Sequence, residues 1–436
     1  MKKSRYNILS SKSNLLFNTM SRSLAVLSNE DYNFFVTPNS DFSDLDENTF
    51  KELYDSGFII DDDRDEIAEV KRAYWQSKFD KTVLHITIMT TLNCNFRCTY
   101  CFEEHRDVNL TDCTLERIKK MVELKLQEGY SRLSIDWYGG EPLLNMSGIK
   151  ELSQFFIQLC NERAIEYVAS ITTNGYTFSP DIQRELFSLG VAHAQITLDG
   201  SKEIHDKRRI LLDGNSSFDT IKNNIINACE GMTISLRINV DSKNCDDLIN
   251  LIDSFKDHRS DLLGIYACIV TPSLGSSYMV GDSKLLMKSI VKMYAYALAH
   301  GFRINNVNSL LAINYRACIV DSDSHYIITP SGELFKCGES YGADDVGLIG
   351  KILESGEMQI DDKRQAKWTK DPFSYEECLN CSYLPICMGG CVMKRITRSK
   401  DFCSWEYSEH FSDILELFYE EICMFREDIS YEKVKV

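Results

Sequence analysis

The chain has 436 residues, which is enough for two or three domains with separate cores. Its net charge of −17 comes from acidic residues throughout the sequence, and such a field repels phosphate backbones, so nucleic acid is excluded as a partner. No apolar stretch is long enough to cross a membrane, and the start MKKSRYNILSSKSN lacks the apolar core of a signal peptide. Because 16 cysteines occur without an export signal, we expect a cytoplasmic protein that uses them for metals or catalysis rather than for disulfides.

The first 80 residues predict a small unit that differs from the rest of the chain. Short apolar runs predict a hairpin or a three-stranded sheet, followed by two helices, a strand and an acidic helix. The runs lie at 6–9, 14–17 and 23–27, the helices at 29–36 and 47–55, the strand at 58–60 and the acidic helix near 62–76. This unit is too small to be a catalytic body, and one interpretation of it is a cap that packs on the next domain.

From about residue 84 the pattern alternates strands with amphipathic helices, which is typical of a parallel α/β sheet or barrel. The predicted strands are 84–90, 133–138, 167–172, 193–198, 233–240 and 262–269, and the predicted helices between them are 112–128, 148–163, 180–189, 217–229 and 245–256. Such units wind in one direction because β/α crossovers are right-handed. We therefore predict a partial (β/α)6 barrel over residues 81–305, with its chemistry where the strands end.

Three cysteines follow the first of these strands directly. Cys94, Cys98 and Cys101 lie in the run T-T-L-N-C-N-F-R-C-T-Y-C-F-E. The C-x3-C-x2-C spacing suits three corners of a cubane [4Fe–4S] cluster and leaves the fourth iron free to chelate a small molecule through an amine and a carboxylate. A zinc site is the alternative, but zinc prefers four ligands in paired C-x2-C knuckles.

This run resembles the cluster motif of the radical S-adenosylmethionine (SAM) superfamily, including the aromatic residue Tyr100 before the third cysteine. The segment Gly139-Gly140-Glu141-Pro142 ends the second strand and resembles the G-G-E motif whose backbone holds the methionyl amino group of SAM in that superfamily. Two glycines also let a backbone approach a ligand closely, and a carboxylate can bind a cationic amine.

Polar side chains end the later strands, as they do around SAM in members of the superfamily. The residues that the resemblance offers for SAM contacts are Asn174, Thr197, Asp199, Arg237 and Asn239. For the last two, a polar network within the barrel is an equally good interpretation. The segment His205-Asp206-Lys207-Arg208-Arg209 resembles one that is common in the SPASM branch of the superfamily, but the sequence assigns it no chemical role.

The resemblance implies a radical reaction. A reduced cluster passes one electron to SAM, and the 5′-deoxyadenosyl radical that forms abstracts a hydrogen atom from an unactivated C–H bond of the substrate. The cofactor performs the difficult step, whereas the protein aims the radical and excludes water. A low-potential electron donor such as flavodoxin or ferredoxin is the implied redox partner, and no catalytic side chain is assigned.

After about residue 305 the periodicity breaks down, which predicts a loop-rich, cysteine-rich domain over residues 306–436. Its cysteines resemble the seven-cysteine SPASM domain, which carries two auxiliary [4Fe–4S] clusters. They are Cys318, Cys337, Cys378, Cys381, Cys387, Cys391 and Cys403. By this resemblance Cys378, Cys381, Cys387 and Cys403 complete one cluster. The other three would hold a second cluster with an open iron, and a pair of zinc sites is the alternative.

The resemblance covers most of the chain, from about residue 84 to residue 403, and it implies a peptide maturase. Many such enzymes carry a winged-helix-like element at residues corresponding to 1–80, which adds the leader of a precursor peptide as a strand on its sheet edge. We expect thioether formation between cysteine sulfur and carbon, because an open iron can bind a substrate thiolate.

Three alternatives stay open. They are carbon–carbon or carbon–oxygen cross-linking, formylglycine formation of the anaerobic sulfatase-maturing type, and a non-catalytic iron–sulfur scaffold. The sulfatase-maturing type usually has an aspartate where this chain has Gly338, directly after the cysteine of the G-x4-C element.

Overall fold

The computed structural model describes residues 1–103, 105–258, 262–271, 277–305, 315–316, 318–341, 346–397, 403 and 410–425. The chain divides into two compact units. The large unit comprises residues 80–305 and 322–369, and the small unit comprises residues 1–79, 306–321 and 370–436.

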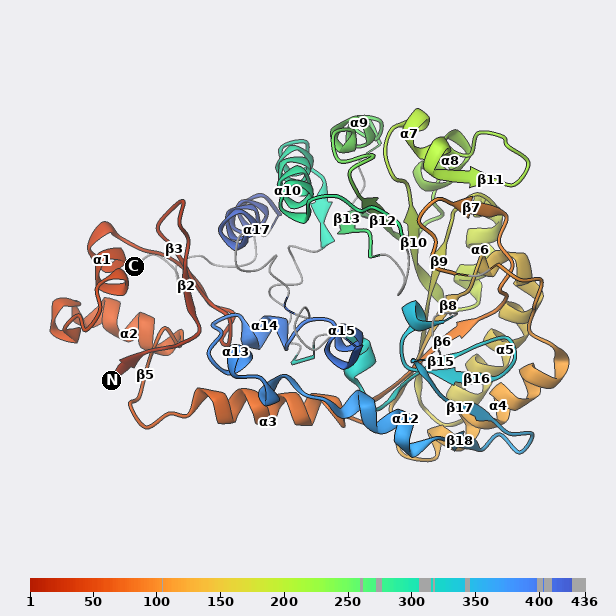
Figure 1. The fold of residues 1–436 in the computed structure, drawn as a ribbon, viewed down its shortest axis with the longest axis horizontal. Coiled ribbons are helices and arrows are strands. Elements are labelled where there is room, and N and C mark those ends of the chain that lie inside the picture. Colours follow the sequence, from red (N-terminus) through yellow and green to blue (C-terminus); the bar gives the residue numbers. More distant parts are fainter. Residues whose placement is uncertain are drawn as a thin grey trace. The chain divides into compact units, whose positions relative to one another are not determined.

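In the described part of the chain, the large unit is built on one sheet of 11 strands (Figure 1). In spatial order they are β14 (Arg303–Ile304), β13 (Leu263–Ile269), β12 (Thr233–Val240), β10 (Val191–Thr197), β9 (Glu166–Thr173), β8 (Arg132–Tyr138), β6 (Val83–Met89), β15 (His325–Ile328), β16 (Glu333–Phe335), β17 (Leu348–Ile352) and β18 (Met358–Ile360). Neighbours from β14 to β15 pair in parallel, and β15 to β18 form an antiparallel meander. The six predicted strands and the α/β fold class are confirmed.

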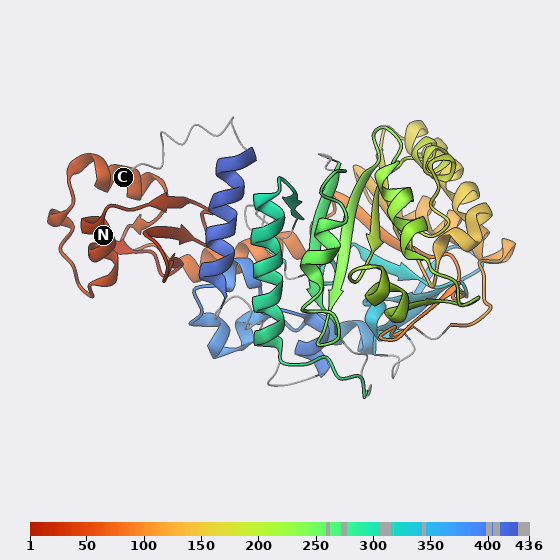
Figure 2. The ribbon, with the colours of Figure 1, turned by 90° about the horizontal axis from the view of Figure 1, so that it is seen from above.

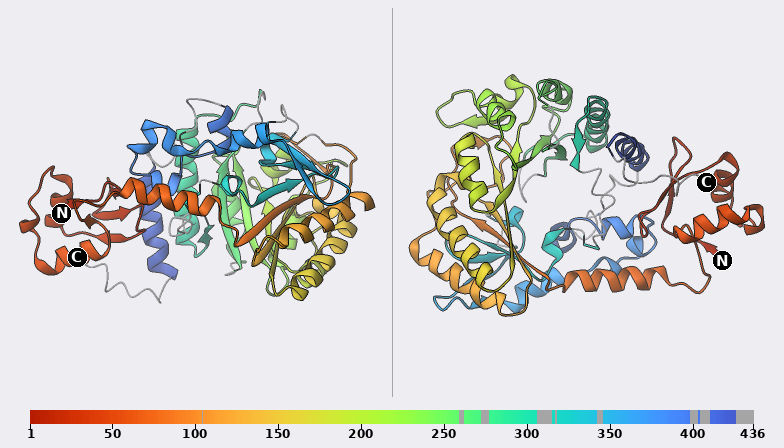
Figure 3. Two further views of the ribbon diagram at one scale, coloured as in Figure 1. Left: turned by 90° about the horizontal axis from the view of Figure 1, so that it is seen from below. Right: turned by 180° about the vertical axis from the view of Figure 1, so that it is seen from behind.

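Helices connect the parallel strands and cover one face of the sheet (Figure 3). They are α4 (Asp112–Leu126), α5 (Met146–Glu162), α6 (Pro180–Ser188), α7 (Lys202–Arg208), α8 (Phe218–Ile226), α9 (Leu248–Asp253) and α10 (Ser283–Ala299), and α12 (Asp362–Ala366) follows β18. A second, two-stranded ribbon pairs β7 (Phe96–Cys98) with β11 (Arg209–Leu211). It joins the loop after β6 to the segment after β10.

The two faces of the sheet differ in polarity. In β8, Leu133, Ile135 and Trp137 are fully buried, whereas Asp136 and Tyr138 on the other face are half-buried. Successive side chains of a strand point to opposite faces, so one face forms the core under the helices and the other is a polar inner surface. Figure 2 shows parallel strands side by side. Because the strands run in the same direction, their carboxyl ends lie along one edge of the sheet.

Strands β15 to β18 were not predicted, because we expected a loop-rich region after residue 305. The strands are only three to five residues long. They are separated by turns such as the one at Gly332, where φ is +82°. Segments this short carry too few residues to reveal a period of two in the sequence.

The small unit contains the predicted N-terminal elements. Its strands are β1 (Lys2–Lys3), β2 (Asn7–Leu9), β3 (Leu15–Asn18), β4 (Leu24–Val26) and β5 (Ile59–Ile60), and its helices are α1 (Asn29–Val36), α2 (Glu47–Asp55), α3 (Glu66–Lys78), α13 (Glu376–Leu379), α14 (Leu384–Cys387), α15 (Val392–Thr397) and α17 (Phe411–Phe425). Strands β2, β3 and β4 form the expected antiparallel sheet.

The N-terminal residues share a core with the C-terminal cysteine segment. Tyr6 and Tyr74 pack with Leu384 and Met388 in one buried cluster. The hydroxyl of Thr19 also donates to the backbone of residue 382 at 2.6 Å. The first 79 residues are therefore part of the support of the cysteine segment, and removing them would expose that core.

Candidate active site

The loop that follows β6 brings Cys94, Cys98 and Cys101 together. Cys94 is buried, Cys98 is half-buried and Cys101 is exposed. The guanidinium of Arg97 donates to the backbone oxygens of Cys94 and Phe96, at 2.7 Å in both cases, which fixes the turn between the first two cysteines.

The electrostatics of these three thiols fit an iron–sulfur cluster. Burial raises the pKa of Cys94 to about 12, and it raises the pKa of the half-buried Cys98 as well. A bound cation is needed to hold all three as thiolates. Among the described residues, no three His, Cys, Asp or Glu side chains converge as they would around a single metal ion. A cubane takes each thiolate at a different iron, and the C-x3-C-x2-C spacing suits three of its corners.

Gly139 and Gly140 let the end of β8 approach the cysteine loop. A Cβ atom on Gly139 would lie 2.3 Å from the backbone oxygen of Thr91, and one on Gly140 would lie 2.3 Å from that of Asn93. The Gly140 N–H donates to Thr91 at 3.0 Å and the Glu141 N–H donates to Asn93 at 2.9 Å. The two glycines therefore place the strand end directly beside the loop.

The carboxylate of Glu141 joins two strand ends. It is fully buried and accepts hydrogen bonds from the Leu143 N–H at 3.1 Å, the Thr173 hydroxyl at 2.7 Å and the Asn174 N–H at 2.7 Å. Burial raises its pKa, and these hydrogen bonds oppose the rise. Glu141 thus braces the ends of β8 and β9. The neighbouring Pro142 accepts from Thr90 through its backbone oxygen at 3.1 Å.

Tyr100 is the centre of a network that unites three of the predicted residues. Its hydroxyl donates to Asp199 and accepts from the side chain of Asn239 at 3.1 Å. Asp199 also accepts from the Asn239 N–H at 3.0 Å. Burial raises the pKa of Tyr100 well above its usual value, so the hydroxyl keeps its proton. The network ties the cysteine loop to the ends of β10 and β12.

The other predicted residues lie around this network. Asn174 donates to the side chain of Asn95 in the cysteine loop at 2.7 Å. Thr197, which is buried, is paired in register with Arg237. The Nε of Arg237 donates to Asn239 at 2.9 Å, and its guanidinium lies 5.5 Å from the ring centroid of Tyr266 on the inner face of the sheet.

The predicted residues did not include two arginines that complete the site. Arg208 donates to Asp241 at 2.7 Å, and its guanidinium lies 5.1 Å from the Tyr100 ring centroid. Arg209 donates to the Tyr100 hydroxyl at 2.9 Å, across a separation of 109 residues in the chain. Adjacent arginines at the end of a short helix were the available signal, but contacts at such separations cannot be read from the sequence.

One acidic side chain of the loop was also missed. Glu103 lies shortly after Cys101, and burial together with the charge of Glu141 raises its pKa to about 8. Burial therefore favours the protonated, neutral form of Glu103 beside the cysteine loop.

Four of the predicted C-terminal cysteines lie close together in the small unit. Burial raises the pKa of Cys378 to about 12, and the charges of Cys387, Cys381 and Cys403 raise it further. The pKa of Cys387 is raised by burial to about 11, again with contributions from Cys381 and Cys403. These mutual effects place the four thiols in one region of the small unit.

The backbone after Cys387 is shaped around its sulfur. Met388, Gly389 and Gly390 have positive φ values of 45°, 75° and 65°. The Gly390 N–H donates to the Cys387 backbone oxygen at 2.9 Å, and the N–H groups of the two glycines lower the pKa of the Cys387 thiol, against the larger effect of burial. Successive N–H groups that point to one place form an anion-binding nest, which suits a thiolate in a cluster.

A buried charge network supports this segment. Asp321 accepts from Tyr74 at 2.9 Å, from Lys78 at 3.1 Å and from Arg395 at 3.1 Å. Arg395 also donates to the Met388 backbone oxygen at 2.7 Å. The network thus fixes the turn that carries the nest.

The remaining predicted cysteines are distributed between the units. Cys318 and Cys391 belong to the small unit, whereas Cys337 follows β16 in the large unit. Cys318 is exposed, and the other two are half-buried.

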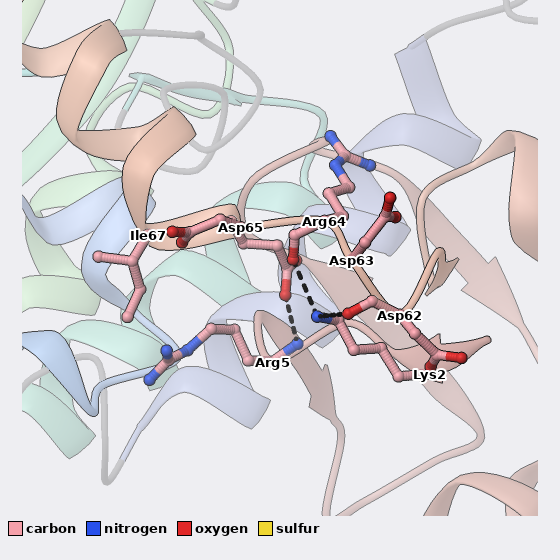
Figure 4. A pocket seen from close by; sticks show the side chains of 8 residues that line it. Lys2, Arg5, Asp62, Asp63, Arg64, Asp65 and Ile67 are labelled. Carbon is pink, nitrogen blue, oxygen red and sulfur yellow. Dashed lines mark hydrogen bonds between the residues drawn. The ribbon is translucent and has the colours of Figure 1, made fainter.

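A shallow hollow in the small unit lies between Lys2, Arg5 and the acidic segment 62–67 (Figure 4). The ammonium of Lys2 donates to the backbone oxygens of Asp62 and Arg64, at 2.9 and 2.8 Å. These contacts hold the loop before α3 against β1, and we assign no catalytic role to the hollow. In the described ranges, no helix is both long and apolar enough to cross a membrane.

Comparisons with known proteins agree with this site. Residues 88–255 match the radical SAM superfamily. The radical SAM cyclopropyl synthase TigE of Paramaledivibacter caminithermalis is 23% identical over 405 residues, which cover 85% of this chain and 80% of that protein. A cysteine-type anaerobic sulfatase-maturating enzyme of Clostridium novyi is 26% identical over 351 residues, covering 75% of this chain and 92% of that enzyme.

A solved structure shares the fold. It is native anSMEcpe with bound AdoMet, with a TM-score of 0.59 and 19% identity, covering 78% of this chain and 97% of that chain. The residues matched to the superfamily include the cysteine loop, the two glycines of β8 and the Tyr100 network. The chain therefore contains a radical SAM domain, which spans residues 88–255.

Proposed function

We propose that this enzyme is a maturase that forms thioether links between cysteine sulfur and carbon in a ribosomally made precursor peptide. The observation that carries the proposal is the arrangement of cysteines. Of the ten predicted ligands, three lie in the radical SAM domain and four in one region of the small unit, and the other three are Cys318, Cys337 and Cys391. Among the relatives, the sulfatase-maturating enzyme is named for its action on another protein, which supports a polypeptide substrate.

We assign three clusters to these cysteines. Cys94, Cys98 and Cys101 would hold the cluster that binds SAM, and the four cysteines of the small unit would hold an auxiliary cluster. When bound, the first cluster and SAM supply a carbon-centred radical that abstracts a hydrogen atom from the substrate. The leftover Cys318, Cys337 and Cys391 would hold a second auxiliary cluster with one iron open to a substrate thiolate, which iron binds well.

The residues of the chain position these groups. The backbone of 139–142, brought to the loop by its glycines, offers carbonyl oxygens to the amino group of SAM. Asp199 and Asn239 fix the Tyr100 hydroxyl by hydrogen bonds. The other polar side chains that we assign to the SAM site are Asn174, Thr197 and Arg237. Their mutual hydrogen bonds set the geometry before SAM binds, which reduces the entropy that binding costs.

The N-terminal sheet is suited to binding a leader. Strand β4 lies at one edge of the sheet, and in the described part of the chain no further strand pairs with it. An extended leader could add there as a fourth strand. Such tethering raises the local concentration of the core peptide at the barrel without tight binding to the core itself. The enzyme also needs a low-potential electron donor such as flavodoxin or ferredoxin, and we propose that it acts in the cytoplasm.

Carbon–carbon bond formation is the second candidate. It is favoured by the similarity to a relative that is named for making a cyclopropyl group. Formylglycine formation is less favoured, because Gly338 takes the place of the aspartate that usually follows the cysteine in such enzymes.

Mass spectrometry of a short peptide encoded beside the gene tests the proposal, after anaerobic co-expression and thiol alkylation. Thioether formation predicts the loss of two hydrogens per link, with one cysteine per link protected from alkylation. The same loss with every cysteine alkylated would assign a cross-link that does not use sulfur. Co-expression with a variant that lacks the three loop cysteines is the matched control, and it should leave the peptide unmodified.

A further inference from the structure

The segment after β10 clamps the cysteine loop. Strand β11 pairs antiparallel with β7, so that Arg209 lies opposite Cys98 and Leu211 lies opposite Phe96. The pairing continues at both ends, where the Thr99 N–H donates to residue 208 at 2.9 Å and the Leu212 N–H donates to residue 95 at 2.9 Å. The loop between the first and third cysteines therefore has a partner strand along most of its length.

Arg209 places its side chain on the cluster side of this ribbon. Residues directly opposite in an antiparallel pair project to the same face, so Arg209 and Cys98 lie together. Arg209 is buried, and one guanidinium nitrogen donates to Tyr100 at 2.9 Å. Its Nε–H is buried and has no hydrogen-bond partner among the described residues. A buried donor without an acceptor is costly, which indicates that an acceptor occupies the site in the working enzyme.

The charge of Arg209 lies against the cysteine loop. Its place opposite Cys98 in the ribbon and its hydrogen bond to the Tyr100 hydroxyl at 2.9 Å hold the guanidinium beside the turn that carries the second and third cysteines. The neighbouring Arg208 differs, because it forms an ion pair with Asp241 at 2.7 Å. For Arg209, no ion pair with a carboxylate occurs within the described residues, and it meets Asp199 only through the Tyr100 hydroxyl that both contact.

We propose that Arg209 is a positioning residue that holds the turn from Cys98 to Tyr100 and stabilises the reduced state of a cluster on the loop. This inference rests on the proposed SAM-binding cluster. Three thiolates make the oxidised cluster site anionic, and reduction adds one more negative charge. A fixed buried cation stabilises the reduced state more than the oxidised state, because the interaction grows with the charge it meets.

The test is a potentiometric titration of the anaerobically reconstituted enzyme, followed by electron paramagnetic resonance. The relevant cluster is identified as the one whose signal changes when SAM is added. Arg209→Met should lower its reduced-to-oxidised ratio at least tenfold at the wild-type midpoint, which is about 59 mV for one electron. Arg209→Lys keeps the charge and should restore most of the ratio. Lys207→Met removes the same charge from an exposed neighbour and should leave the midpoint unchanged.

Each result supports or overturns the proposed role of Arg209. A wild-type midpoint in R209M with full iron content would overturn the electrostatic role. If R209M loses the loop iron, the titration of R209K decides, since a midpoint near the wild type supports the role of the charge. Loss of the loop iron from both variants would leave a purely structural clamp and also overturn the proposal. If the wild-type enzyme has no SAM-responsive signal, the proposed function fails instead.

Discussion

Neutralising Asp321 is the sharpest test of how the small unit is held together. This carboxylate is buried and interacts with two buried cations, Lys78 and Arg395, each at 3.1 Å, as well as with the hydroxyl of Tyr74 at 2.9 Å. Asp321→Asn keeps the shape of the side chain but removes the only negative charge in this group of three ionised side chains. Both buried cations then lose this anion, and removing one partner is the costly way to break a buried ion pair.

The expected loss of unfolding free energy is large. Removing one partner of a buried pair costs about 3–5 kcal/mol, and the lower end applies here because the amide oxygen can still accept one hydrogen bond. Since 1 kcal/mol corresponds to about 2–4 °C in a domain of this size, the melting temperature of the small unit should fall by roughly 10 °C. The turn that carries the nest should lose order with it, because Arg395 also holds Met388.

Anaerobic calorimetry of the reduced apoprotein measures this loss, with Glu69→Gln as the matched control. Glu69 is in the same unit and pairs with Arg64 at 2.8 Å, but both side chains are exposed. Such a surface pair contributes less than about 1 kcal/mol. The reasoning is refuted if D321N melts within about 2 °C of the wild type, which is less than the shift expected for 1 kcal/mol. It is also refuted if both variants lose the same amount, since burial would then not decide the cost.

Three other perturbations have defined outcomes. Replacing the three loop cysteines with alanine should abolish 5′-deoxyadenosine formation, measured by chromatography, while the iron of the auxiliary sites remains; retained cleavage of SAM would contradict the assignment. Burial lowers the pKa of His205 from 6.5 to about 3, so its contribution to stability is complete above pH 6.5 and is lost as the pH falls toward 3. His205→Gln should therefore flatten the acid limb of the urea-unfolding profile of the apoprotein, whereas the exposed His258→Gln should not. Val26→Pro should block strand addition at the outer edge of β4 and reduce leader-dependent processing at least about 100-fold, with SAM cleavage unchanged. Leu9→Pro on β2, the opposite edge of the sheet, is the control.

Much of the fold was predictable because it depends on local patterns. The parallel strands read as apolar runs between amphipathic helices, and α1 and α2 were predicted with their observed bounds. The short strands after residue 305 were not, because a strand of three residues has no detectable period. The core shared by residues 1–79 and the cysteine segment was equally hidden, since it joins positions more than three hundred residues apart.

In the candidate active site, too, local motifs were predictable and contacts between distant residues were not. The cysteine triplet and the two glycines were identifiable because a cluster and a close backbone approach demand those residues at those spacings. The bracing role of Glu141 was not predictable, because its carboxylate oxygens accept hydrogen bonds from Thr173 and Asn174 at the end of the next strand. The segment that contains Arg209 was noted in the sequence, but the role of Arg209 could not be predicted, since it depends on the pairing of β11 with β7.

Arg209 and Arg395 show how similar residues beside cysteines can have different effects. Arg395 lies 3.1 Å from the Asp321 carboxylate, so its charge is balanced within the protein. Arg209 donates instead to the hydroxyl of Tyr100, whose raised pKa keeps it neutral. Arg395→Met should therefore lower the melting temperature of the small unit and leave the midpoint of the SAM-responsive cluster unchanged, whereas R209M should shift that midpoint. A shift of the same size in both variants would show that the midpoint reports general loosening of the protein and not the charge at Arg209.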